Sequence, residues 1–291
     1  MTQPQNSPKL FRWPHTPWVA ARAVGLGALA TSMGLGLAVA TQACGSDGED
    51  STGGKRVVLH TRVTIEPAAL DTFESALGWQ VTLSKAATSA GPFYYFDGTP
   101  PLVLGERTSP WQYAARWLGL GRAHAHPGHY QAGNAMGEMR TSSSLDLLGG
   151  EAEFPDGDGV SGIYRSARFT FSEPTGPAAS ELDGHAVVAE GVAEMGGKQR
   201  YFRAVADLSG IEKSASEGHI EGCEFSEVDV EDDGTVTVTV NPVIWFDLVD
   251  FTDAEPGSAD QPAEFPIDSQ PQIAFVLGVT QLSAYKFRYA K

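Results

Sequence analysis

Apolar and polar residues alternate along much of this chain, and a period of two residues predicts strands with one buried face. The clearest cases are RVVLHTRVTIEP at 56–67 and TVTVTV at 235–240. Similar stretches recur through most of the second half of the sequence. We therefore expect strands at 56–67, 79–84, 92–96, 160–172, 185–195, 198–208, 225–230, 235–240 and 273–289.

Turn-forming residues separate these stretches. Gly196-Gly197 and the acidic turn 231–234 are each typical of a hairpin between two antiparallel strands. One short helix is expected after Asn241, which can cap it, because Pro242 suits the first helical position and apolar residues follow at helical spacing. Residues 252–271 are rich in proline, glycine and acids, and predict a surface loop.

The order of these elements predicts the fold class. Long helices do not alternate with the strands, so a parallel α/β sheet is not expected. The pattern at 111–120 fits either a short helix or a strand that enters the next segment. We predict that residues 56–291 form an all-β domain, a mostly antiparallel β-sandwich with one or two short helices.

The first 43 residues have a different pattern. Lys9, Arg12 and Arg22 precede the segment 23–40, which carries no charge and ends in small residues. This arrangement predicts a secretory signal peptide over residues 1–43. The alternative is a membrane-spanning helix, because the uncharged segment is close to the minimum length for crossing a bilayer.

Cys44 follows this segment, and residues 44–55 are polar and glycine-rich, as in a flexible linker. With Ala43 before the cysteine, the arrangement resembles that of bacterial lipoproteins. The resemblance implies that Cys44 carries a lipid and anchors the protein at the cell envelope, on the periplasmic face of a membrane or on the cell surface. The alternative is cleavage after residues 38–40, which would leave a soluble protein whose Cys44 and Cys223 could pair in an oxidising compartment.

The net charge of the chain limits the kinds of molecule that we expect it to bind. The formal net charge is −16 at pH 7, and an acidic surface repels phosphate groups. Nucleic acid is therefore not an expected partner, whereas cations and basic proteins are. The sequence has no nucleophile elbow, phosphate-binding glycine loop or dinucleotide fingerprint, so we do not predict an enzyme. A hydrolase whose residues meet only in the folded chain is the remaining enzymatic alternative.

Candidate metal ligands are concentrated at 121–139. In Ala-His-Ala-His, a strand would direct His124 and His126 to one face, and Pro127-Gly128 would turn the chain so that His129 returns toward them. Imidazole suits copper, zinc and nickel, and a thioether selects reduced copper. The sequence thus predicts a copper-type site, whose candidate ligands are His124, His126, His129, Met136 and Met139.

Glu138 and Tyr130 are candidates for an additional oxygen ligand or hydrogen-bond partner of that site. The alternative is that the histidines are solvated loop residues and that both methionines pack in the core. The acidic turns 156–159 and 229–233 are candidates for calcium, although neither matches a twelve-residue calcium loop. His60, on the polar side of its strand, is expected to have no functional role.

The body of the chain is similar in organisation to the bacterial periplasmic copper-binding proteins associated with methanobactin. The similarity rests on an exported β-protein with a His-rich segment, several tryptophans and a final strand that ends in Ala-Tyr-Lys-Phe-Arg-Tyr at 284–289. It implies a copper-handling role. Two hypotheses follow: an envelope lipoprotein with a metal site, or an envelope interaction or structural module without a metal.

Overall fold

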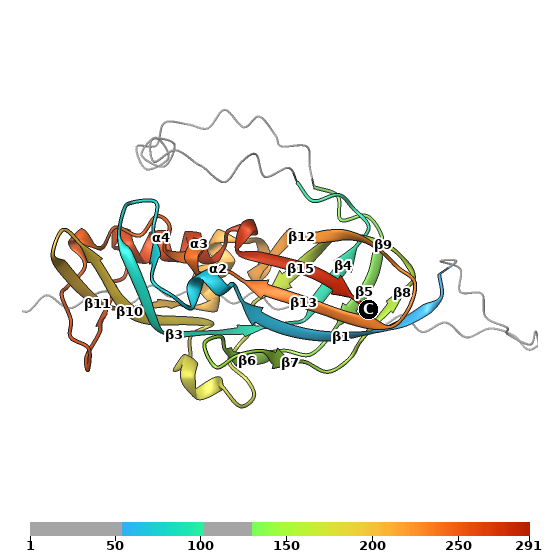
Figure 1. The fold of residues 1–291 in the computed structure, drawn as a ribbon, viewed down its shortest axis with the longest axis horizontal. Helices are drawn as coiled ribbons and strands as arrows, with labels where there is room; N and C mark the ends of the chain where they lie inside the picture. Colours follow the sequence, from blue (N-terminus) through green and yellow to red (C-terminus); the bar gives the residue numbers. More distant parts are fainter. Residues whose placement is uncertain (1–53, 102–129) are drawn as a thin grey trace, which may run out of the picture. The chain divides into compact units, whose positions relative to one another are not determined.

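The computed structural model describes residues 54–101 and 130–291 (Figure 1). These residues belong to one compact unit, residues 48–291. Strands make up 47% of the structure and helices are few and short, which confirms a mainly β fold. Within the described ranges, no helix is both long enough and apolar enough to cross a membrane. The predicted signal peptide, Cys44 and the segment 111–120 lie outside those ranges.

Eight strands form a closed barrel of mixed direction. The β1–β13 and β12–β15 pairs are parallel, and the other pairs are antiparallel. The two-residue strand β7 (Ala152–Glu153) also pairs with β1. In order around the barrel, the strands are β13 (Gly234–Val240), β15 (Tyr285–Ala290), β12 (His219–Val230), β9 (Gly162–Thr170), β4 (Phe93–Phe96), β5 (Ala135–Met139), β8 (Gly157–Val160) and β1 (Arg56–Ile65).

The plain β-sandwich predicted from the sequence is wrong, because the first sheet closes on itself. Residue pairs from Leu59 with Gly234 to Ile65 with Val240 join β1 to β13 in parallel. Closure gives a partner to strand edges that a sandwich would leave exposed. Alternation correctly predicted one buried face on β1 and β13, but it did not predict β5 and β8 and does not specify which strands are neighbours.

A second, open sheet follows the order β14-β11-β10-β3-β2, and β6 pairs with β3. Its central hairpin joins β10 to β11 through Gly196 and Gly197, which both have positive φ angles, as the sequence predicted. The strands are β2 (Phe73–Glu74), β3 (Gln80–Ala90), β6 (Ser143–Asp146), β10 (Val187–Met195), β11 (Lys198–Ala206) and β14 (Ala263–Glu264).

Three short α-helices complete the described part of the chain: α2 (Leu208–Ser214), α3 (Pro242–Phe246) and α4 (Gln270–Val279). The predicted helix α3 begins as expected, since the Asn241 side chain accepts a hydrogen bond from the Val243 amide at 3.1 Å. Single turns of 3-10 helix lie at η1 (Pro67–Ala69), η2 (Ala179–Leu182), η3 (Ser216–Gly218), η4 (Phe251–Asp253) and η5 (Leu282–Ala284).

The strand predicted at 273–289 is wrong in its first half, which forms α4. Ser269 caps this helix by accepting a hydrogen bond from the Gln272 amide, and Pro271 lies in its first turn. The helix packs against α3 and β11, so it is apolar on more than one side. A short apolar segment of this kind has no periodicity that separates a buried helix from a buried strand. The second half forms β15, as predicted.

Aromatic side chains fill the barrel. Their ring centroids lie 5.4 to 6.3 Å apart, and each side chain is almost completely buried. They belong to the same hydrophobic core as the residues between the second sheet and α3, so both sheets share one core. The aromatic residues of the barrel interior are Phe93, Tyr95, Tyr164, Phe169, Phe225 and Phe287.

Candidate functional site

The predicted metal ligands fall into two groups. His124, His126 and His129 lie outside the described residues, as does Cys44, the predicted lipidation site. Met136 and Met139 lie on β5. Met139 is completely buried in the core, and its sulfur accepts a hydrogen bond from the Thr141 amide at 3.3 Å. Met136 is only partly buried and lines a groove outside the barrel.

Because Met139 lies three positions after Met136 along one strand, the two side chains leave opposite faces of the sheet. The structure therefore does not bring Met136 and Met139 together around one point. Met139 has the core position that the alternative interpretation gave it, whereas Met136 remains accessible from outside. The copper prediction rests on the three histidines and stays a prediction.

Each histidine of the described ranges lies beside a single carboxylate. No three histidine, cysteine, aspartate or glutamate side chains in these ranges are grouped closely enough to hold a metal ion. The pairs are His60 Nδ1 with Asp156 Oδ1 at 2.6 Å, His185 Nδ1 with Asp207 Oδ1 at 2.6 Å, and His219 Nε2 with Glu221 Oε1 at 3.5 Å.

A shallow groove of about 550 Å³ lies on the outer face of strands β4, β5, β8 and β1. Its residues come from short alternating segments, in which every second side chain points away from the core. On β5, Gly137 and Met139 face inward, and Met136 and Glu138 face the groove. The side chains that line it are Arg56, Tyr94, Met136, Glu138, Arg140, Asp158 and Val160.

Glycines let β5 and β8 pack closely over the barrel interior beneath this groove. Gly137 and Gly159 are Cα partners across the two strands. A Cβ atom at Gly159 would lie 2.6 Å from the Tyr164 hydroxyl and 2.8 Å from Leu59 Cδ1. The Tyr164 hydroxyl donates toward the Met136 and Val160 carbonyls, at 2.7 and 3.0 Å. Core packing therefore fixes the backbone that carries the groove.

Two carboxylates face each other across the floor of the groove. Glu138 on β5 is the Cα partner of Asp158 on β8, and like charges in this position repel. Arg140 Nε donates to Glu138 at 2.8 Å. Arg140 also lies close enough to Asp158 for the charge of this carboxylate to raise the pKa of Arg140. Arg140 therefore offsets part of the repulsion between the two carboxylates.

Tyr94 is the Cα partner of Glu138 on the other side of β5. The Arg168 guanidinium lies over the Tyr94 ring, 5.5 Å from its centroid, and also pairs with Glu221. Arg168 and Tyr94 are themselves Cα partners, so the contact follows from the strand register. The arrangement shows that a guanidinium fits against this ring.

No family model matches this chain, and no curated protein or solved structure is similar to it at a significant level. Its function must therefore be inferred from its own residues.

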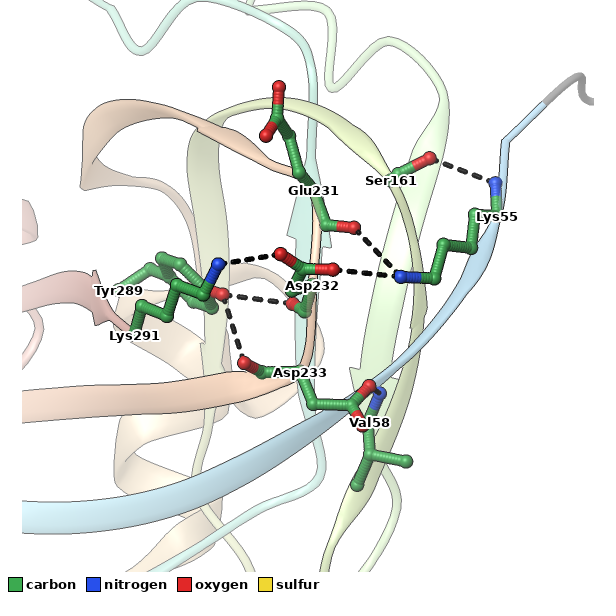
Figure 2. A network of polar contacts seen from close by, with 8 residues as sticks. All are labelled: Lys55, Val58, Ser161, Glu231, Asp232, Asp233, Tyr289 and Lys291. Carbon is green, nitrogen blue, oxygen red and sulfur yellow. Dashed lines mark hydrogen bonds and ion pairs between the residues drawn. The ribbon is translucent and has the colours of Figure 1, made fainter.

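A second polar cluster lies where the barrel closes (Figure 2). Asp232, between β12 and β13, accepts hydrogen bonds from Lys291 Nζ at 2.7 Å and Lys55 Nζ at 2.8 Å. These hydrogen bonds lower the pKa of Asp232 to about 2. Asp233 accepts a hydrogen bond from the Val58 amide at 2.7 Å, and the Tyr289 hydroxyl donates to the Asp232 carbonyl at 2.8 Å.

These contacts join β1, β13 and β15 at one end of the barrel. The carboxylates of the turn 229–233 that were candidates for calcium include Asp232 and Asp233, and both make contacts within the protein. Cys223, by contrast, is buried inside the fold, and burial raises the pKa of its thiol to about 12. We regard the closure cluster as structural and the outer groove as the candidate site.

Most residues of the groove were not singled out from the sequence. Glu138 was predicted only as an accessory metal ligand, and Asp158 only as part of an acidic turn. Arg56, Arg140 and Tyr94 were not predicted at all. The alternation of Met136, Glu138 and Arg140 was the available signal, but it becomes informative only when β8 is known to be the neighbour of β5.

Proposed function

We propose that this protein is a non-enzymatic binding module of the cell envelope, and that its partner docks on the outer groove of strands β4, β5, β8 and β1. The observation that carries this proposal is the open groove itself, whose lining combines charged, aromatic and apolar side chains on the outside of a barrel whose interior is filled by aromatic side chains. Because aromatic side chains fill the interior of the described barrel, we expect recognition to take place on its outer surface.

Site-specific photo-crosslinking in the source cells tests this proposal. Val58 is 37% exposed and is the Cα partner of Asp158, so a benzoyl-phenylalanine at this position lies beside the groove. Leu70 is 57% exposed and belongs to another surface, which makes it the matched control position. We expect one discrete crosslinked product from position 58 and none from position 70. Equal crosslinking from both positions, or none from either, would reject the groove as the docking surface.

Anchoring at the envelope is part of the proposal and rests on the sequence of residues 1–55. If Cys44 carries the lipid, labelled palmitate enters the natural chain and does not enter Cys44→Ala. Incorporation into both chains would contradict lipidation at this residue.

A copper-type site is the second proposal. It is supported by the clustering of His124, His126 and His129 and by the access of the Met136 thioether from the groove. Titration of the purified chain with Cu(I) against a chromophoric chelator measures it. We expect stoichiometric binding that is lost when the three histidines are replaced by alanine and weakened in Met136→Leu, while Met139→Leu has no effect. Unchanged affinity in the triple-alanine variant would reject the site.

A further inference from the structure

Helix α4 is apolar on both of its sides, and it contains no charged residue. On one side, its buried residues recur at helical spacing and face α3 and β11. On the other side, Ile273 is 44% exposed, and Leu277, about one turn further along, is partly exposed. The buried residues of the inward side are Pro271, Ala274, Phe275, Gly278 and Val279.

The chain directly before α4 adds a third exposed apolar residue. Ile267 lies two positions before the capping Ser269 and is 87% exposed, more than any other large apolar residue of the described ranges. A helix at a protein surface normally turns a polar side to water, and neighbouring exposed apolar residues mark interaction surfaces. We call the surface of Ile267, Ile273 and Leu277 the α4 face.

The chain around the α4 face carries acids and no bases. Residues 241–285 contain no lysine, arginine or histidine, although aspartate and glutamate recur along them. Asp268 directly precedes the capping residue of α4, and the Asp250 amide donates a hydrogen bond to the Gln270 side chain at 3.0 Å. The 3-10 turn η4, which contains Asp253, also packs against α4. The α4 face therefore has an acidic border at the start of the helix.

The charges around the α4 face distinguish between its possible occupants. A second copy of the chain would bring two acidic borders together, and the net charge of −16 adds to that repulsion. An anionic membrane surface is repelled in the same way. The neighbouring helix α2 does not change this balance, because it contributes one charge of each sign, Glu212 and Lys213. A basic protein segment is the occupant that the charges favour.

A helix is the form in which such a segment fits α4 best. Ile273 and Leu277 are four positions apart, so they form a ridge that fits between the side chains of a second helix. With ten residues, α4 is about 15 Å long and offers almost three turns of contact. Apolar residues at every third and fourth position of the second helix would cover the ridge.

We propose that the α4 face is a docking surface for a basic amphipathic helix of a partner protein. The apolar stripe of that helix covers Ile267, Ile273 and Leu277, and its lysines and arginines lie against the acids at the start of α4. The elements that pack most closely against α4 do not line the outer groove, so this surface goes beyond the proposed function. A chain with both surfaces can hold two partners, or one partner at two points.

Fluorescence anisotropy with labelled peptides tests the proposal on the full chain. The probe is a fluorescein-labelled amphipathic helix built from leucine and lysine. One matched probe has the same residues in scrambled order, which removes the apolar stripe, and another has glutamate in place of lysine. We expect the scrambled peptide to bind about tenfold more weakly than the leucine–lysine helix, and the glutamate peptide to bind least, because its charges repel the acids.

Apolar variants show whether the α4 face is responsible. Ile267→Gln with Ile273→Gln removes most of its exposed apolar surface, and we expect the leucine–lysine helix to bind about tenfold more weakly. The control is Ile163→Gln, since Ile163 is 39% exposed on the barrel strand β9. Binding to the control should stay within about twofold of binding to the natural chain.

Charge variants test the acidic border separately from the apolar residues. Asp253→Asn with Asp268→Asn neutralises two acids beside α4, and asparagine tolerates the left-handed backbone of Asp268, whose φ is 63°. We expect about threefold weaker binding. The control, Asp229→Asn with Glu153→Gln, changes the net charge equally at exposed barrel positions, and its effect should be smaller because only long-range attraction changes.

Three results would overturn the proposal. The first is equal binding to the natural chain and to Ile267→Gln with Ile273→Gln, and the second is binding of the scrambled or glutamate peptide as tight as that of the leucine–lysine helix. The third comes from sedimentation: a dimer that the same double variant converts to a monomer would assign the α4 face to a second copy of the chain. Crosslinking from position 58 enters none of these results, so the α4 face and the outer groove are tested independently.

Discussion

Asp232 shows how one exposed side chain can join distant parts of the sequence. Its carboxylate binds Lys55, which precedes β1, and Lys291, which follows β15. The hydrogen bonds and charges of both lysines stabilise the ionised form, so the pKa of Asp232 falls from its ordinary value to about 2. The shift links the protonation of one residue to the closure of the barrel.

The pH dependence of stability follows from the direction of that shift. A carboxyl with a lowered pKa in the folded state stabilises the fold above its unfolded pKa, near 4, and loses this contribution as the pH falls through about 2. We therefore expect Asp232→Asn to lower the free energy of unfolding at pH 7, and the difference from the natural chain to shrink between pH 4 and pH 2. Urea unfolding at several pH values measures this, and Asp260→Asn should show no comparable pH-dependent difference.

The sequence did not show which way single side chains point or which residues become their neighbours, and this limited the prediction of the site. Met136 and Met139 were predicted as ligands because a thioether can bind copper. Only Met136 faces outward, because the alternation of side chains along β5 places Met139 in the core. Asp158 has an ordinary sequence context, an Asp-Gly turn former. Its role depends on Glu138, twenty residues earlier, and no local pattern joins the two.

At the scale of elements, the close packing of β5 and β8 against neighbouring strands requires small residues. Gly137, Gly157 and Gly159 lie where a Cβ atom would approach backbone or side-chain atoms of neighbouring strands at 2.5 to 2.9 Å. The side chains of Leu59 and Tyr164 occupy the space that these glycines leave. Large and small residues thus alternate across the barrel wall, which keeps its interior filled.

Gly159→Ala tests this packing. The added methyl group would overlap with the Tyr164 hydroxyl and Leu59, so we expect the free energy of unfolding to fall by about 1–3 kcal/mol. Gly210→Ala is the control, since Gly210 lies within α2 with open space around it. There the change should raise stability by about 0.5–1 kcal/mol. Equal effects of the two substitutions, measured by denaturant unfolding, would contradict the packing argument.

Element prediction succeeded at several strong local signals, but the acidic turn 231–234 does not form the predicted hairpin, because β15 lies between β12 and β13. Alternation located β1 and β13, two glycines with positive φ angles joined β10 to β11, and a cap with a following proline started α3. It failed at α4, where burial on several sides removes the periodicity. It also could not predict barrel closure, because parallel pairing of β1 with β13 depends on residues far apart in the sequence.

At the scale of the whole described unit, the barrel and the second sheet share one hydrophobic core. Phe202 of β11 lies 5.1 Å from Phe246 of α3, measured between ring centroids, and Phe246 in turn lies 6.4 Å from Phe73 of β2. A shared core makes separate unfolding of the two sheets unfavourable. We therefore expect both sheets to unfold in one cooperative transition.

Phe202→Ala tests this cooperativity. Loss of a completely buried phenylalanine should cost about 3–5 kcal/mol. The buried Cys223 thiol, on the barrel strand β12, reports on the barrel, because it reacts with iodoacetamide only after it becomes exposed. We expect the denaturant midpoint for Cys223 labelling to shift in the variant by the same amount as the loss of far-ultraviolet circular dichroism. An unchanged midpoint for Cys223 would show that the barrel unfolds independently.

The shared carboxylate of Asp232 also has a consequence for chain topology. Because Lys55 and Lys291 bind the same side chain, the first and last described residues are close enough in space to be joined by a short peptide. A circular permutant that links residue 291 to residue 54 and opens the chain between Gly196 and Gly197 would keep every strand pairing of the barrel. The new N-terminus of such a permutant would lie in the β10–β11 hairpin of the second sheet. A membrane anchor attached to that terminus would therefore hold the protein by the second sheet and not by the end where the barrel closes.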